Sequence, residues 1–150
     1  MVNIVNRGID YRYKILDKFE AGINLKGFEV KSLRNNRGSL NGSYISIKYG
    51  EVYLINFQLP PYQPKNVPKD YDPNRPRKLL LKKNEIIYLT TKIKEKGLTI
   101  IPLRIYSKNN LIKIEIALAK GLKKFEKREK IKEKEFKKIK NKIEKTRIII

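Results

Sequence analysis

Alternating hydrophobic and polar positions predict β-strands along much of the chain. Near its start, aromatic and branched residues occupy every second position, at Tyr11, Tyr13 and Ile15. This period of two is typical of a strand. Similar runs predict further strands at 44–48, 52–57, 98–106 and 111–119. In the last run Ile112, Ile114, Ile116 and Leu118 alternate with Lys, Glu and Ala, so we expect one buried face and one available face.

Two segments break the alternation and predict helices. The stretch FEAGINLKGFEVKSLR (19–34) starts extended, turns around Gly22 and Gly27, and then has apolar residues at 28, 30 and 33. The two asparagines at 35 and 36 are residues at which such a helix can end. In the second segment we expect Asn84 to cap a helix whose apolar face runs from Ile86 to Ile93, and Gly97 to end it.

Three segments have no regular pattern. Residues 1–9 look like a loose basic arm, and 38–42 are a loop of small polar residues. The segment 60–76 holds six of the seven prolines. Loops longer than about 12 residues in compact domains are usually functional or disordered, so this one is too long to be a mere connection.

Five or six strands with short antiparallel connections and two inserted helices predict a mainly β (α+β) fold. A small antiparallel β-barrel, closed or nearly closed, is the natural architecture, because closure removes edges that would otherwise pair with other chains. The oligonucleotide-binding barrel is one such fold. The alternative is an antiparallel sheet covered by the two helices. We place this domain at 1–119 and a basic tail at 120–150.

The net charge points to a polyanionic partner. Thirty-six Lys and Arg against fifteen Asp and Glu give a net charge of +21. Repulsion among so many positive charges is best tolerated when the partner is nucleic acid or, as the next choice, an anionic membrane. No apolar run reaches the roughly 20 residues of a spanning helix, so we expect no membrane partner. Abundant Lys, Ile and Asn also indicate an adenine- and thymine-rich genome, which accounts for part of the lysine excess.

The missing residue types argue against an enzyme. Without cysteine there are no disulfides or cysteine-based zinc sites, and without histidine the usual general base and serine triad lose their central part. We therefore expect no catalytic residues, metal or cofactor.

The tail changes composition sharply. Residues 120–150 contain 14 Lys or Arg and 5 Asp or Glu, a net charge of +9. The spacing of Phe136, Ile139 and Ile143 is helical, but this face is too narrow to support a stable tertiary contact. We expect the tail to be disordered when free and helical on a polyanion. A solvated basic helix packed on its own barrel is the alternative.

Three blocks together resemble the small protein B family. They are FEAGINLKGFEVKSLR (19–34), DPNRPRKLLLKKNEI (72–86) and ALAKGLKKFEKR (117–128). The resemblance implies a cytoplasmic protein with an oligonucleotide-binding-like barrel, which binds the transfer-RNA-like domain of transfer-messenger RNA and, with elongation factor Tu, delivers it to stalled bacterial ribosomes. It also implies a tail that becomes helical in the empty messenger channel, near the decoding centre of the small subunit. We expect a monomer.

The resemblance implies particular RNA-contact residues, namely Tyr13, Glu20, Leu80 and Lys113. In the tail it implies ribosome contacts by Lys120, Gly121, Lys123, Lys127 and Arg128, with Phe125 in a slot where an aromatic ring can stack on a base. On charge alone we also expect Arg34, Arg75 and Arg77 to contact RNA phosphates.

Several of these residues have a simpler structural interpretation. Glu20 and Glu29 are more simply salt-bridge or capping partners, and the run Leu79 to Leu81 is more often core than contact. A general basic RNA-binding or ribosomal protein is the alternative function. A nuclease using Asp70, Asp72 and a metal comes third, because carboxylates in a proline-rich turn are usually turn formers.

Overall fold

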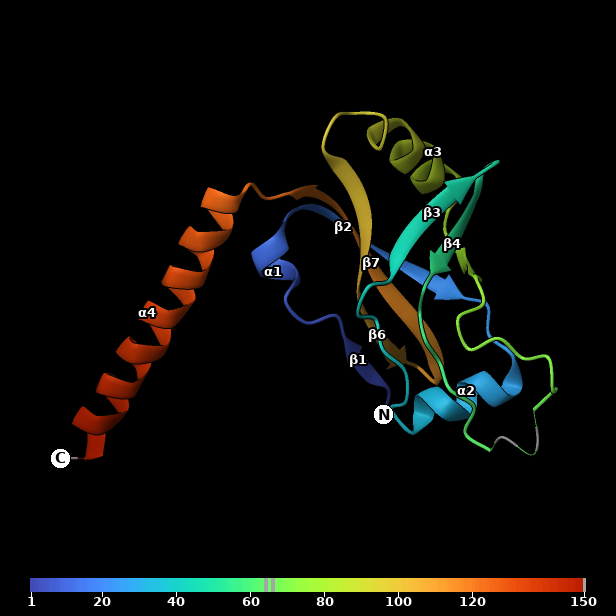
Figure 1. Ribbon diagram of the computed structural model, residues 1–150, viewed down its shortest axis with the longest axis horizontal. Helices are drawn as coiled ribbons and strands as arrows, with labels where there is room; N and C mark the ends of the chain where they lie inside the picture. The colour runs from blue at the N-terminus through green and yellow to red at the C-terminus, as the bar shows by residue number, and fades with distance from the viewer. Residues whose placement is uncertain (64, 66, 150) are drawn as a thin grey trace.

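A seven-stranded antiparallel sheet with four helices forms the described part of the chain (Figure 1). The computed structural model describes residues 1–63, 65 and 67–149, and within 124–149 it describes the side chains of 126–142. The strands are β1 (Asn3–Val5), β2 (Tyr13–Ile23), β3 (Tyr44–Lys48), β4 (Glu51–Ile55), β5 (Arg77–Leu80), β6 (Leu98–Lys108) and β7 (Leu111–Gly121). The helices are α1 (Ile9–Arg12), α2 (Gly27–Arg34), α3 (Lys83–Lys92) and α4 (Lys124–Ile149).

The sheet is curled but its hydrogen-bonded ladder is open. The strand order is β1-β6-β7-β2-β5-β4-β3, so β1 and β3 are the two edges among the described strands. The curl brings β3 into contact with β6. The predicted mainly β, antiparallel fold is confirmed, although the ladder does not close into a complete barrel.

The helices lie around the sheet rather than within it. In Figure 1, α2 and α3 lie at opposite ends of the sheet, α1 precedes β2, and α4 projects away from the domain. No helix in the described part of the chain is long and apolar enough to cross a bilayer.

The hydrophobic core lies mainly on one face of the sheet. Ile114 and Ile116 of β7 are fully buried there with Leu33 of α2 and Leu89 of α3. This confirms the buried face predicted from the alternation in β7. The prediction that the other face is available is wrong at Ala117 and Ala119, because α1 places Ile9 over them in a second, smaller core.

The amino terminus is an edge strand, so the prediction of a loose arm is wrong. Val2 and Ile4 are buried, and Ile4 pairs with Ile105 across β1 and β6. The Asn6 backbone N–H donates to the Leu103 carbonyl at 2.8 Å. The sequence signal for this strand is weak, because Val5 is apolar at an exposed position and Asn6 is polar at a buried one.

The two predicted helices form close to the expected places. The helix predicted from Phe28 is α2, and it ends at Arg34, before the asparagines. In α3 the capping residue differs from the prediction: the N-cap is Lys82, whose backbone N–H donates to the Glu85 carboxylate at 3.1 Å. Asn84 instead lies in the first turn. The prediction that Gly97 ends this helix is wrong, because α3 ends at Lys92. Gly97 lies five residues further on, with a φ of 82° that favours glycine.

Candidate nucleic-acid interface

Strand register brings three of the predicted RNA-contact residues together. Gly22 of β2 pairs with Leu80 of β5 on one side and with Lys113 of β7 on the other. Directly paired residues share a face of a sheet, and residues two apart on one strand do as well. Glu20 therefore lies on the same face as Leu80 and Lys113. We call Glu20, Leu80 and Lys113 the strand patch.

Leu80 is an exposed apolar residue at the edge of this patch. Its side chain is 58% exposed, whereas Leu79 is 2% exposed and Leu81 is half-buried. A Cβ added at Gly22 would lie 3.3 Å from the Leu80 Cβ, so the glycine gives Leu80 room to lie against β2. The expectation that the leucine run belongs to the core is confirmed for Leu79 and wrong for Leu80.

Glu20 is held as an anion by residues of β6. Tyr106 donates its hydroxyl to one Glu20 oxygen, and the Lys108 ammonium lies 3.4 Å from the same oxygen. The Tyr106 hydrogen bond is the main reason that the Glu20 pKa is lowered. Burial, and then the Glu20 carboxylate, raise the pKa of Tyr106 to about 12, so this phenol keeps its proton at neutral pH. The interpretation of Glu20 as a salt-bridge partner is confirmed.

Beside the patch, β6 carries a further charged residue, Arg104. The Arg104 guanidinium lies 3.7 Å from the Glu115 carboxylate and 4.3 Å from the centre of the Tyr106 ring. Sequence reasoning missed Arg104, Tyr106 and Lys108. They lie opposite Glu115, Lys113 and Leu111 of β7, a register that becomes visible only in the folded structure.

The structure overturns the prediction that Arg77 faces phosphates. Its side chain is fully buried, and its guanidinium donates to Glu29 at 2.8 Å, to the Phe57 carbonyl at 2.6 Å and to the Pro73 carbonyl at 3.0 Å. The guanidinium is already paired inside the protein. Arg75 also donates to Glu29, with 25% of its side chain exposed.

The partner of both arginines is the buried carboxylate of Glu29. It also accepts hydrogen bonds from the Lys26 backbone N–H at 2.9 Å and the Tyr71 hydroxyl at 3.1 Å. Burial acts to raise the Glu29 pKa, but the hydrogen bonds from Arg75 and Lys26 and the charge of Arg77 leave it lowered. This confirms the salt-bridge and capping interpretation of Glu29. We call Glu29, Tyr71, Arg75 and Arg77 the buried network, which ties the 60–76 loop to α2.

Arg34 and Tyr13 lie outside the strand patch, Arg34 on helix α2 and Tyr13 at the start of β2. Arg34 is exposed in the last turn of α2. Tyr13 is half-buried against the second core and pairs with Gly121, at the end of β7 where the tail begins. The structure therefore groups Tyr13 with the tail residues instead of with Glu20.

The tail leaves the sheet through an ordered junction. Lys120 is exposed at its pairing with Lys14, and the Leu122 backbone N–H donates to the Arg12 carbonyl at 2.9 Å. β7 thus extends to Gly121, two residues past the predicted domain boundary.

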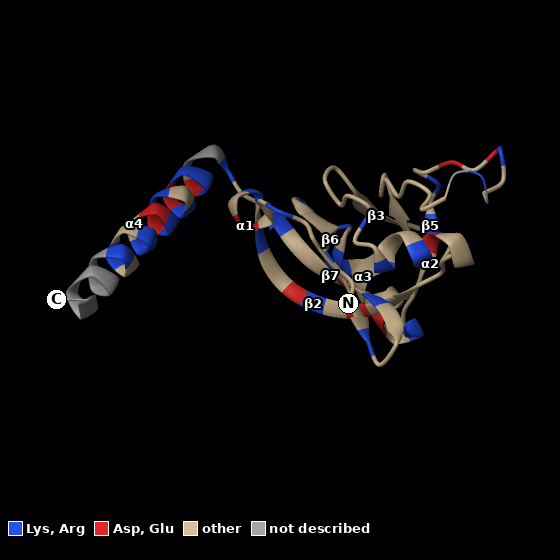
Figure 2. Cartoon of the chain, turned by 90° about the horizontal axis from the view of Figure 1, so that it is seen from below, with Lys and Arg blue, Asp and Glu red and all other residues tan. Residues whose placement is uncertain are grey.

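Beyond the junction, α4 carries closely spaced lysines and arginines (Figure 2). The Lys134 ammonium lies 4.8 Å from the centre of the Tyr11 ring in α1, and its hydrogen bond with Tyr11 raises the Lys134 pKa. Lys127 is half-buried, whereas Lys123 and Arg128 are exposed. The predicted contact Phe125 falls outside the described side chains. That the tail orders on a polyanion stays a prediction.

Asp72 in the 60–76 loop behaves as a turn residue. The Asp72 carboxylate accepts the Asn74 backbone N–H at 2.9 Å, a side-chain turn typical of aspartate. In the described part of the chain, no three acidic side chains are grouped so that they could hold a metal ion.

Comparisons with known proteins place this arrangement in a family. Residues 3–146 match the family model of the SmpB protein. An SsrA-binding protein of Sulfurihydrogenibium sp. (strain YO3AOP1) is 53% identical over 132 residues, which cover 88% of this chain and 86% of the relative. That of Malacoplasma penetrans (strain HF-2) is 46% identical, with coverages of 88% and 90%. A chain in a solved structure of "tmRNA-SmpB: a journey to the center of the bacterial ribosome" matches with a TM-score of 0.67 and 42% identity, and the match covers 83% of this chain and 87% of that one.

Proposed function

Because the chain belongs to the SmpB protein family, we propose that it binds the transfer-RNA-like domain of transfer-messenger RNA and delivers it to stalled ribosomes in trans-translation. The observation that carries this proposal is the strand patch. Residues from three adjacent strands, β2, β5 and β7, meet there, although they lie up to 93 positions apart in the chain.

The patch offers three different contacts to a folded RNA. Lys113 supplies positive charge for a phosphate, and Leu80 supplies an apolar surface for a base or sugar. Glu20 cannot attract a phosphate, but its carboxylate can accept hydrogen bonds from a base edge or a ribose hydroxyl. Tyr106 and Lys108 are positioning residues, because they fix the orientation and charge of Glu20 without needing to touch RNA.

The second part of the proposal concerns the tail. We propose that Lys120, Gly121, Lys123, Phe125, Lys127 and Arg128 contact the ribosome, with α4 in the empty messenger channel near the decoding centre. The helical spacing and net positive charge of the tail support this role. On the same proposal the protein acts as a monomer in the cytoplasm, together with elongation factor Tu.

A binding titration tests the proposal. Full-length protein and a version ending at Leu122, which keeps β7 complete, are titrated with the transfer-RNA-like domain and with a single-stranded RNA of equal length. Salt of about 150 mM weakens nonspecific phosphate attraction. We expect both proteins to prefer the folded domain. Equal affinity for the two RNAs, or a preference that disappears with the tail, would instead identify a general basic RNA-binding protein.

A further inference from the structure

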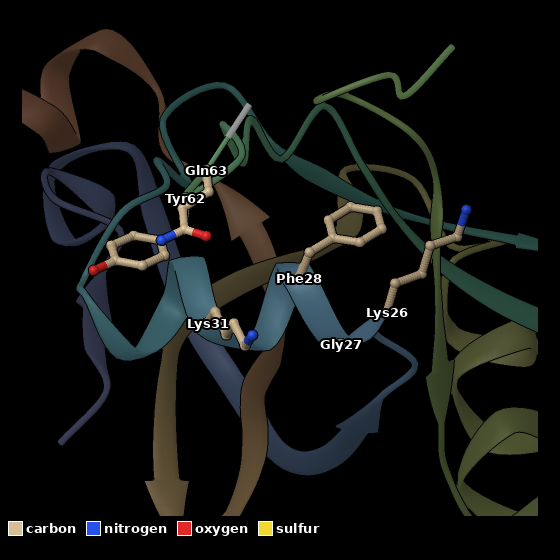
Figure 3. Close-up of a pocket in the computed structure, with 6 residues that line it drawn as sticks. All are labelled: Lys26, Gly27, Phe28, Lys31, Tyr62 and Gln63. Carbon is tan, nitrogen blue, oxygen red and sulfur yellow. The ribbon is translucent and has the colours of Figure 1, made fainter. Parts of the chain in front are cut away.

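A hollow of about 390 Å³ lies between α2 and the 60–76 loop, and none of the strand-patch residues lines it (Figure 3). Tyr62 and Gln63 come from the loop, and Figure 3 shows them beside the helix that carries Phe28 and Lys31. Lys26 and Gly27, at the start of α2, complete the lining. We call this hollow the α2 pocket.

The lining combines aromatic rings with positive charge. Phe28 is half-buried and Tyr62 is exposed, so both rings offer surface to a flat ligand. Lys26 and Lys31 are exposed and supply two ammonium groups. None of the described lining residues is acidic. Aromatic faces bind nucleobases by stacking and lysines bind phosphates, so this combination suits an unpaired nucleotide.

The pocket is held in shape by contacts behind it. Phe28 packs its ring at 89° to Tyr71, with 4.8 Å between ring centres, and Tyr71 belongs to the buried network. On the loop side, the Arg37 guanidinium lies 5.4 Å from the centre of the Tyr62 ring and donates to the Pro61 carbonyl at 3.3 Å. A nucleotide would therefore meet a pocket that needs little further ordering, which lowers the entropic cost of binding.

The charge around the pocket also favours an anion. Glu29 is the acidic residue of α2, and its carboxylate is fully buried against Arg75 and Arg77. The network as a whole keeps a net positive charge, because two guanidinium groups share one carboxylate. An incoming phosphate therefore meets the positive charges of Lys26 and Lys31.

We propose that the α2 pocket binds a single unpaired RNA nucleotide, with its base against Tyr62 and its phosphate near Lys31. This site is separate from the strand patch, so it would act whether or not that patch binds transfer-messenger RNA. It would give the protein a second RNA contact at the α2 end of the sheet.

Amide NMR of the full-length ¹⁵N-labelled protein tests the proposal, because it separates binding at the pocket from binding at the basic tail. The probe is octauridine, a single strand, in about 150 mM salt to weaken nonspecific binding. We expect the Gly27 amide signal to shift in a saturable way. An abasic oligomer of equal length has no bases to stack on an aromatic ring. Its affinity, measured at Gly27, should therefore be about 10-fold weaker than that of octauridine.

Two matched variants identify the ring that is responsible. Tyr62→Ala should weaken the affinity at Gly27 about 10-fold. Tyr49→Ala removes a fully exposed tyrosine from the β3–β4 turn and should leave the affinity unchanged. Unchanged signals elsewhere in the sheet establish that each variant is folded.

Three results would overturn the proposal. One is that octauridine shifts only tail signals; another is that the abasic oligomer binds the pocket equally well. The third is that an acidic peptide such as oligoglutamate binds there with the same dependence on Tyr62, which would make the pocket a protein-docking site. Binding of the transfer-RNA-like domain by Tyr62→Ala, measured separately, distinguishes failure of this proposal from failure of the strand-patch function.

Discussion

Replacing Glu29 with glutamine tests the energetic importance of the buried network. The substitution keeps the shape of the side chain but removes the charge shared by Arg75 and Arg77. Glu29 and Arg77 are both fully buried. Removing one partner of a buried ion pair costs about 3–5 kcal/mol, because the other charge remains uncompensated. At about 2–4 °C per kcal/mol for this chain length, Tm should fall by roughly 6–20 °C.

The same variant should also change the pH dependence of stability. Burial acts to raise the Glu29 pKa, but its hydrogen bonds and ion pairs lower it below the unfolded-state value. This carboxylate therefore stabilises the fold above its unfolded-state pKa, and the contribution is lost as the pH falls through its folded-state pKa. The stability difference between wild type and Glu29→Gln should shrink over that acidic range.

Urea unfolding followed by circular dichroism, at neutral pH and then at decreasing pH, measures both effects. Glu51→Gln is the matched control, because Glu51 lies 3.4 Å from the Lys78 ammonium in an exposed pair. An exposed pair contributes little, so the control should stay within about 0.5 kcal/mol of wild type. A loss below about 1 kcal/mol for Glu29→Gln, or a difference that does not change with pH, would refute this account of the network.

Three further substitutions test individual contacts. Gly38→Ala should lower the free energy of unfolding by roughly 1–3 kcal/mol, because its Cβ would lie 2.9 Å from the buried Phe57 ring. Gly42 also has a positive φ, 79° against 111° at Gly38, but a Cβ there would meet no atom within 4 Å, so a thermal melt that shows equal losses for Gly42→Ala would contradict the clash. Leu80→Ala should leave the free energy of unfolding nearly unchanged while weakening binding of the transfer-RNA-like domain. Leu79 is buried, so Leu79→Ala should lower the free energy of unfolding by about 2–5 kcal/mol. A Leu80→Ala variant with full RNA affinity would show that Leu80 is not part of the RNA contact. Tyr106→Phe should raise the Glu20 pKa towards its ordinary value by deleting the hydroxyl donor, and an NMR titration that matches wild type would show that the hydrogen bond is unimportant.

The sequence allowed the strands and short helices to be predicted because their signals are local. Ile112, Ile114 and Ile116 alternate within one run, and this run is a strand with that face towards the core. The open ladder has no such local signal. It depends on whether the edge strands β1 and β3 pair with each other, and β1 was missed because three residues give a weak pattern.

The candidate site could be predicted only in part for the same reason. Charge alone made Arg77 an RNA contact, because nothing near it in the sequence shows that Glu29, 48 positions earlier, will be its buried partner. The contribution of Tyr106 was hidden in the same way, since it lies 86 positions from Glu20. Pairings of this kind depend on strand register and on the route of the 60–76 loop, so they required the folded structure.

The ladder between β2 and β7 links the two parts of the proposed function. It runs from Tyr13 opposite Gly121, where the tail begins, to Gly22 opposite Lys113 in the strand patch. Tyr13 and Gly22 are nine positions apart on β2, which at about 3.3 Å per residue separates the two ends by roughly 30 Å. A continuous ladder fixes this separation far better than a flexible linker would. The register shifts between Ile15 and Asp17, and such bulges bend and twist a strand. On the proposed function, this bulge therefore helps set the direction in which the tail leaves the sheet relative to an RNA bound at the patch.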